Sequence, residues 1–124
     1  MHRPTRPTGA ELEVLQVLWD RGSITVREVH NSLRATHSTG YTTVLKIMQI
    51  MYEKGLLERD ESSRAHVYSA LVTQEDTQGQ FVQDMVSKVF AGSTSQLVVR
   101  ALDGKSSAKE IAEIRAILNQ LEGK

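Results

Sequence analysis

Residues 25–57 read TVREVHNSLRATHSTGYTTVLKIMQIMYEKGLL, and this stretch predicts two helices joined by a short turn. Thr25-Val26-Arg27-Glu28 has the spacing of a capping box, which opens the first helix. Turn-forming residues from Thr36 to Gly40 separate it from the second helix, Tyr41 to Lys54, which Gly55 ends. A short helix, a tight turn and a longer helix are typical of a helix-turn-helix unit.

The sequence before this stretch predicts one more helix. Thr8-Gly9-Ala10-Glu11 is a second capping box, and Gly22 ends the helix that it opens. Apolar residues recur there at three- and four-residue spacing, so we expect them to share a buried face. The residues expected in the core are Leu12, Leu15, Leu18 and Trp19, and those expected to face water are Glu11, Glu13 and Gln16.

The residues after Gly55 predict a β-hairpin. Leu56–Arg59 and Ala65–Tyr68 have the pattern of two strands around a polar turn from Asp60 to Arg64. A hairpin that follows three helices is a wing. Residues 1–72 are therefore predicted to form a winged helix-turn-helix domain.

Residues 73–124 have the pattern of three further helices, each with one apolar face. Thr73 caps the first, which Ala91-Gly92-Ser93 ends; a shorter one runs from Thr94 to Leu102, and Ser107 opens the last. About 50 residues are too few to bury these faces in a stable monomeric core, so we expect self-association. The residues predicted to form a homodimer interface are Val82, Met85, Val86, Val89, Phe90, Leu97, Ile111, Ile114 and Leu118.

The predicted fold class is mainly α with a small β-hairpin wing: a winged helix-turn-helix domain followed by a C-terminal helical dimerisation tail. In such a domain the helix that follows the tight turn enters the major groove of DNA. Helix 41–54 has Val44, Ile47, Met48 and Met51 on one side and Thr42, Lys46, Gln49 and Glu53 on the other. An ordinary solvated face would give the same polar stripe, but the surrounding elements favour reading of the groove.

The predicted DNA contacts follow from that helix face and from the wing. Those on helix 41–54 are Tyr41, Thr42, Thr43, Lys46 and Gln49, and those on the wing, toward phosphates, are Arg64 and His66. Glu53 is too far from the helix start to be an expected base contact. Arg3 and Arg6, in an arm flanked by prolines, are weaker candidates for contact with the DNA backbone or a minor groove.

Composition excludes several other classes of protein. Fifteen Lys and Arg balance fifteen Asp and Glu over 124 residues, so charge alone does not indicate nucleic acid. The absence of cysteine excludes disulfides, thiolate metal sites and thiol nucleophiles. No residues have the spacing of a catalytic site or phosphate loop, so we predict neither an enzyme nor a cofactor. His30 and His37 are better explained as surface histidines than as metal ligands.

The sequence also predicts where the protein acts. No apolar stretch approaches the ~18 residues of a membrane span, and the start of the chain lacks the apolar segment of a signal peptide. We therefore expect a cytoplasmic protein that does not associate with membranes.

Several short motifs occur together in a specific order. They are Glu11-Leu12-Glu13-Val14-Leu15 with Leu18-Trp19, Thr25-Val26-Arg27-Glu28-Val29, Tyr41-Thr42-Thr43-Val44, Glu53-Lys54-Gly55-Leu56-Leu57 and Arg64-Ala65-His66-Val67-Tyr68. From about Thr8 to Leu121 the chain resembles the penicillinase repressor family (BlaI/MecI/CopY). The resemblance implies a repressor that binds palindromic operators as a dimer, often those of β-lactamase or related resistance genes. It also implies release when a signal from a sensor protease leads to cleavage in the tail.

Residue by residue, the family's recognition positions fall here on Thr42, Thr43, Lys46 and Gln49, whereas Ile50 departs from the basic or polar residue often found there. The family's cleaved Asn-Phe pair corresponds to Arg100-Ala101, which does not match it. The cysteine-rich motif of copper-responsive members is missing. The inducing signal therefore stays open.

Two other classes of function compete with the repressor. A winged-helix module for protein–protein contact would explain the apolar Ile50 on or near the recognition face. An enzyme subunit without catalytic residues of its own is the other alternative. Salt-dependent, sequence-specific DNA binding would separate the repressor from both.

Overall fold

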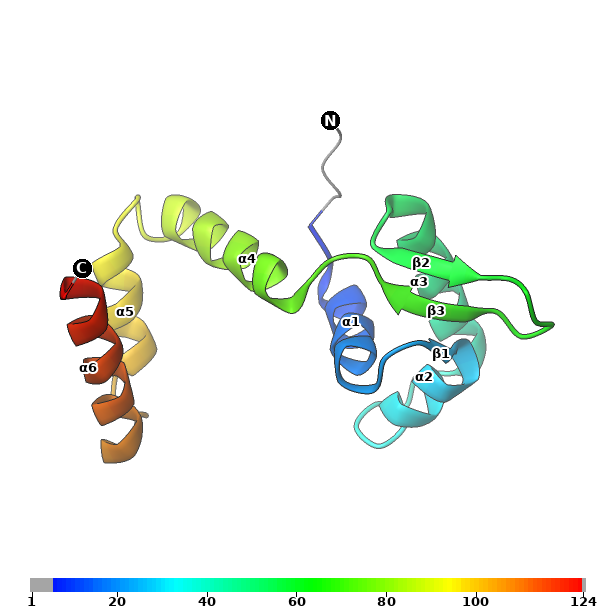
Figure 1. Cartoon of the computed structure of the whole chain (residues 1–124), viewed down its shortest axis with the longest axis horizontal. Helices are drawn as coiled ribbons and strands as arrows, with labels where there is room; N and C mark the ends of the chain where they lie inside the picture. The colour runs from blue at the N-terminus through cyan, green and yellow to red at the C-terminus, as the bar shows by residue number, and fades with distance from the viewer. Residues whose placement is uncertain (1–5, 124) are drawn as a thin grey trace. The chain divides into compact units, whose positions relative to one another are not determined.

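The computed structural model describes residues 6–123, which divide into two compact units, one up to Phe81 and one from Val82 onward (Figure 1). The order of elements confirms a mainly helical fold with a small sheet. The elements are α1 (Gly9–Arg21), β1 (Ile24–Thr25), α2 (Val26–Leu33), α3 (Tyr41–Lys54), β2 (Leu57–Asp60), β3 (Val67–Ala70), α4 (Gln74–Lys88), α5 (Thr94–Leu102) and α6 (Ala108–Glu122).

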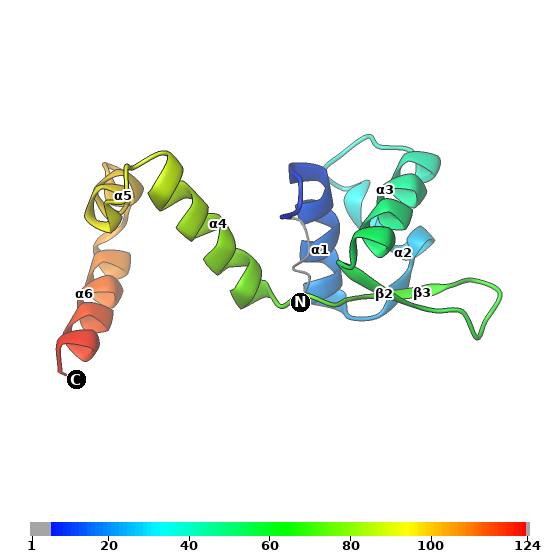
Figure 2. The same cartoon turned by 90° about the horizontal axis from the view of Figure 1, so that it is seen from above.

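The core of the first unit lies where α1, α2 and α3 pack against one another and against the sheet (Figure 2). Its most buried members are at most 1% exposed: Val14, Leu15, Val29, Val44, Met48, Met51, Leu56 and Leu57. Local chemistry sets the helix ends, because Thr8 and Thr25 form the predicted capping boxes. Gly55, at φ 85°, ends α3 in the left-handed conformation that favours glycine.

The sheet has three strands rather than the two predicted, in the order β1-β3-β2. Strand β1 pairs with β3 in antiparallel register, Ile24 opposite Tyr68 and Thr25 opposite Val67. Both hairpin strands begin later than predicted, at Leu57 and Val67. For β2 the reason is local: the amide of Leu56 donates to the carbonyl of Met51 and so belongs to the end of α3. The wing loop is consequently Glu61–His66.

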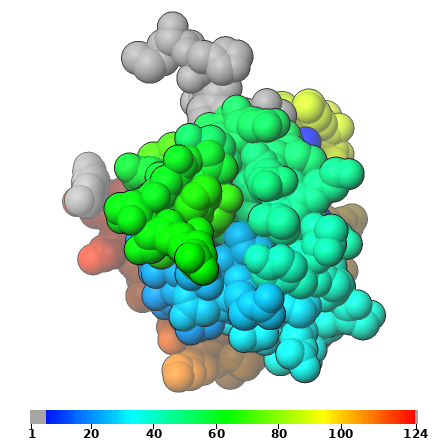
Figure 3. All heavy atoms as spheres, turned by 90° about the vertical axis from the view of Figure 1, so that its right-hand side faces the viewer, coloured from blue at the N-terminus to red at the C-terminus, as the bar shows by residue number. Residues whose placement is uncertain are grey.

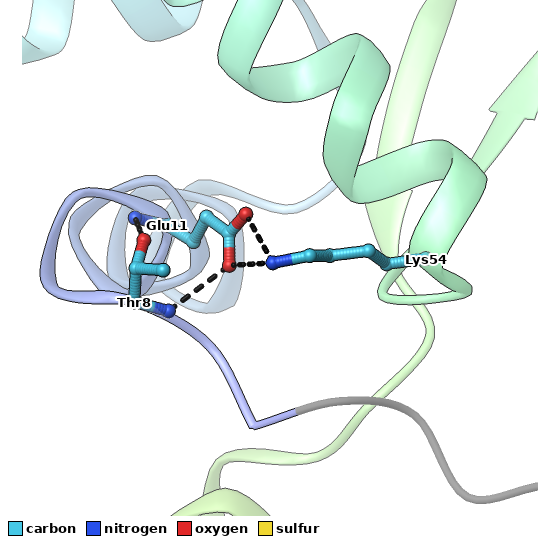
Figure 4. A network of polar contacts seen from close by, with 3 residues as sticks. All are labelled: Thr8, Glu11 and Lys54. Carbon is cyan, nitrogen blue, oxygen red and sulfur yellow. Dashed lines mark hydrogen bonds and ion pairs between the residues drawn. The ribbon is translucent and has the colours of Figure 1, made fainter.

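Glu11 corrects the prediction for α1. We expected this carboxylate to face water, but the residue is only 5% exposed. Its Oε1 accepts from the backbone amide of Thr8 at 3.0 Å, and its Oε2 lies 2.8 Å from Nζ of Lys54 (Figure 4). The carboxylate therefore ties the start of α1 to the end of α3. Val14 belongs to the core, whereas the predicted core residues Leu12 and Trp19 are half-buried.

The second unit contains the end of α4 with α5 and α6. Helix α4 ends at Lys88, so Val89 and Phe90 lie in the turn that follows and not in the predicted helix. Ala91 and Gly92 there adopt positive φ, and the Gly92 amide donates to the carbonyl of Val86 at 2.8 Å. Ser93 and Ser107 then cap α5 and α6 through the amides of Gln96 and Glu110.

Among residues 6–123, every helix falls short of the length and apolar character that a membrane crossing requires.

Candidate nucleic-acid interface

Helix α3 begins differently from the other helices of the described chain. Threonine or serine hydroxyls accept from backbone amides in the first turns of α1, α2, α4, α5 and α6. Gly40 precedes α3 and provides no side-chain cap. The amides of the first turn of α3 therefore stay available to an external acceptor, and the helix dipole makes this end attractive to anions.

The two faces of α3 separate as the periodicity predicts. Val44, Met48 and Met51 are each 0% exposed and fill the core. Side chains with hydrogen-bonding groups occupy the exposed face: Thr42, Thr43, Lys46, Gln49 and Glu53. Hydroxyl, ammonium and amide groups on one exposed helix face are the chemistry that base edges and phosphates accept.

Tyr41 differs from its predicted neighbours because its side chain is half-buried. The guanidinium carbon of Arg27 lies over its ring, 4.7 Å from the ring centroid. The ring of His30 meets it edge-on, with centroids 6.0 Å apart and planes at 86°. Tyr41 therefore joins the first residue of α3 to α2, a contact that helical periodicity alone did not predict.

The turn between α2 and α3 is fastened by two histidines. Nε2 of His30 donates to the carbonyl of Thr39 at 2.9 Å. Nε2 of His37 lies 2.8 Å from a carboxylate oxygen of Glu13 on α1, and Nδ1 shares a hydrogen bond with the Thr36 hydroxyl. His30 therefore holds the end of the turn before α3, and His37 connects the turn to α1. Within residues 6–123 no three His, Asp or Glu side chains are grouped to hold a metal ion.

The wing brings its predicted residues to the loop between β2 and β3. Arg64 is exposed there, and His66 is half-buried immediately before β3. The base of the loop is ordered by Asp60, whose carboxylate accepts from the Ser62 amide at 2.9 Å. Hydrogen bonds from the backbone and the side chain of Ser62 lower the pKa of Asp60. Figure 3 shows the surface on which the wing, α2 and α3 lie together.

Arg59 was not among the predicted site residues, and it stabilises the same end of the wing loop from strand β2. Its guanidinium lies over the ring of Tyr52, 4.0 Å from the centroid, and Nε donates to Glu61 at 2.6 Å. Hydrogen bonds to Tyr68 and Glu61 raise its pKa. Arg59 therefore attaches the loop to α3.

Of the arginines in the N-terminal arm, Arg3 lies outside the described residues. Arg6 lies over the ring of Phe81, 5.5 Å from the centroid, within the first unit.

The predicted interface residues of the tail fall into three classes of exposure. Val86 is buried, at 8% exposed. Those that are half-buried are Phe90, Leu97, Ile111 and Ile114, and those that are exposed are Val82, Met85, Val89 and Leu118. Further exposed apolar side chains are Val98, Val99, Ile117 and Leu121. The second unit therefore leaves many apolar side chains uncovered. Arg100 and Ala101 are exposed on α5.

A family model described as penicillinase repressor matches residues 7–120. The chain belongs to the penicillinase repressor family. The transcriptional regulator BlaI of Mycobacterium tuberculosis is 28% identical over 123 residues, 98% of this chain and 89% of that protein. The methicillin resistance regulatory protein MecI of Staphylococcus aureus is 24% identical over 114 residues, 91% of this chain and 93% of that protein.

A solved structure of another penicillinase repressor supports the same fold. BlaI of Bacillus licheniformis, in monomeric form in complex with the blaP half-operator, is 29% identical, with a TM-score of 0.52. The match covers 61% of this chain and 93% of that one. Membership of the penicillinase repressor family confirms the predicted winged-helix fold and a DNA-binding transcriptional repressor rather than an enzyme.

Arg27, like Arg59, lies at this surface and was not predicted from the sequence. Arg27 and His30 are three residues apart and therefore share one side of α2. That spacing was visible in the sequence, but the aromatic ring between them belongs to the next helix. Only the packing of α2 on α3 brings the three together.

Proposed function

We propose that this protein represses transcription by placing α3 in the major groove of double-stranded operator DNA, with the wing on the flanking backbone. One observation carries the proposal: the exposed polar face of α3 begins at a helix end without a side-chain cap. DNA phosphates would supply the acceptors that this end of the helix lacks. The polar side chains that follow it would then face the base edges.

The proposed roles of the individual residues follow from their chemistry. Thr42 and Thr43, in the first turn of α3, contact phosphates or bases through their hydroxyls. Lys46 donates to guanine acceptors, and Gln49 pairs with adenine through its amide. Arg64, exposed on the wing loop, contacts a phosphate, and half-buried His66 supports the loop beside it. Tyr41 acts by positioning the start of α3.

We further propose that residues 73–124 pair two copies of the chain, while residues 1–72 bind DNA. The exposed apolar side chains of the second unit would be buried in the homodimer. Its two recognition helices would meet successive major grooves of a palindrome, about 34 Å apart. Because the net charge is zero, strong binding would depend on joining two modest half-site contacts.

Release from DNA would follow from anything that weakens this pairing. A sensor protease or another inducer would act on the tail, where Arg100 and Ala101 lie exposed on α5. Arg100 is 3.7 Å from Asp103, an ion pair at the end of that helix. The protein would act in the cytoplasm, on β-lactamase or related resistance genes.

The first test is a genome-wide selection of DNA fragments with the purified chain, followed by titration of the best fragment at two salt concentrations. An inverted repeat whose binding weakens as salt rises would support the proposal, since phosphate contacts release counterions. No enrichment at low salt would overturn it. That result would favour a protein-interaction module, for which the exposure of Ile50, at 42%, is the supporting observation.

The second test concerns the recognition face. Lys46→Ala combined with Gln49→Ala should lower discrimination between the selected fragment and random DNA at least about tenfold for each half-site. Gln16→Ala combined with Lys105→Ala removes the same groups from exposed positions elsewhere, and should leave discrimination unchanged. Fluorescence anisotropy with both DNAs measures it. Equal discrimination by the two double variants would refute the assignment of α3.

A further inference from the structure

Arg27 is exposed in the first turn of α2, with its guanidinium over the ring of Tyr41 at the start of α3. We propose that Arg27 binds a DNA phosphate beside the groove and that Tyr41 holds it in position. This inference rests on the proposed function, DNA binding through α3, and assigns a partner chemistry to a residue outside the recognition helix.

The ring that holds Arg27 is itself fixed by its packing and by His30. Tyr41 is half-buried, and His30 contacts its ring edge-on at a centroid distance of 6.0 Å. Because a carbonyl oxygen only accepts, Nε2 of His30 carries the hydrogen that bonds to Thr39. The His30 ring is thereby anchored to the turn before α3. The ring under Arg27 thus has a defined place at the start of the recognition helix.

The contact with Tyr41 orients Arg27 without consuming its hydrogen-bond donors. A guanidinium carries its five N–H groups around the edge of its plane, whereas an aromatic ring attracts the cation over the ring face. Among residues 6–123, Arg27 forms no ion pair. By contrast, Arg59 is paired with Glu61, and Arg21 donates to Ser32 and to the carbonyl of Glu28. Arg27 is therefore held in place with its donors available.

The position of Arg27 in the fold favours phosphate over base as its target. In a helix-turn-helix domain the helix before the turn crosses the DNA backbone, while the following helix enters the groove. Helix α2 lies on the same surface as α3 and the wing (Figure 3). A planar guanidinium binds phosphate oxygens with paired N–H groups, and such a contact fixes register without reading sequence.

The proposal makes Tyr41 a positioning residue. Tyr41→Phe keeps the aromatic face and should keep the affinity, because the contact with Arg27 does not involve the hydroxyl. Tyr41→Leu keeps an apolar side chain but loses the ring face, so its affinity should fall toward that of an Arg27 variant. If Tyr41 only packed against its neighbours, Tyr41→Leu would have the same effect in the parent protein and in an Arg27 variant.

The experiment measures binding of the full chain to the best selected fragment and to a random-sequence duplex, over a range of salt concentrations. Arg27→Gln should weaken both complexes by the same factor, about tenfold per half-site, and reduce the salt slope by about 0.9 per half-site. Arg27→Lys should restore the slope because it keeps the charge. Lys105→Gln, an equal charge change in the second unit, is the control and should match the parent protein.

The outcomes separate this inference from the proposed function. If the parent protein selects a fragment but Arg27→Gln binds it with unchanged affinity and slope, the phosphate contact is wrong and the repressor stands. If Arg27→Gln changes the discrimination between the two DNAs, Arg27 reads bases and the proposal is overturned. Failure of the parent protein to select any fragment would overturn both. Thermal melting of each variant tests whether the fold is retained.

Discussion

Glu11 illustrates, at the scale of a single residue, what a sequence motif predicts and what it omits. The capping box predicts the contact with Thr8 because both partners lie within one turn of α1. It does not predict Lys54, which is 43 residues away and reaches Glu11 only when α3 packs against α1. The burial of this carboxylate was therefore outside the reach of local reasoning.

That ion pair leads to a prediction about stability. Lys54→Met should lower the free energy of unfolding by about 2 kcal/mol, because it leaves a buried carboxylate with only the Thr8 amide as partner. Urea unfolding followed by circular dichroism measures the change. Lys46→Met, an exposed position on the same helix, is the control. Equal midpoints for the two variants would show that the pair contributes nothing to stability.

The ends of the helices were predictable at the scale of the element, and the pairing of the strands was not. Capping groups and terminal glycines act within a few residues, so the start of α2 and both ends of α3 follow from the sequence. Strand β1 forms only because β3 lies beside it, more than forty residues later in the chain. Strand β2 begins one residue later than predicted because the Leu56 amide bonds to the end of α3.

The cap of α2 predicts a dependence of stability on pH. Hydrogen bonds from the backbone and side chain of Thr25 lower the pKa of Glu28, with a smaller contribution from Arg21. The stabilisation is therefore present above the ordinary pKa of glutamate and is lost as pH falls through the lowered value. Glu28→Gln removes the titration but keeps a hydrogen-bonding group. The parent protein should be more stable than this variant at neutral pH, and the difference should shrink as the pH falls below the ordinary pKa of glutamate.

Urea midpoints of both proteins across this pH range provide the measurement for Glu28. Glu113→Gln is a control, since that exposed carboxylate on α6 is outside any helix cap. A difference that stays constant from neutral pH to well below the ordinary pKa of glutamate would contradict the role assigned to the ionised carboxylate.

For the molecule as a whole, the polar face of α3 was predictable because it depends on periodicity within one helix. The Arg27, His30 and Tyr41 cluster was not, since it joins two helices across a turn. In the tail, periodicity identifies the apolar faces but not which of their residues are buried. The structure shows that Val86 is covered within one chain, whereas Met85 and Leu118 are exposed.

This distinction decides how the dimer is tested. Aspartate at Val86 would disturb the chain's own packing, whereas Met85→Asp with Leu118→Asp places charge only on exposed apolar positions. We expect this double variant to sediment as a monomer, to retain its helical circular dichroism and to bind a single half-site with unchanged affinity. Its affinity for the full palindrome should fall at least about a hundredfold, because joining two sites provides that gain.

Gln83→Asp with Gln120→Asp, at exposed polar positions, is the control and should remain a dimer. A dimer that survives Met85→Asp with Leu118→Asp would place the interface elsewhere.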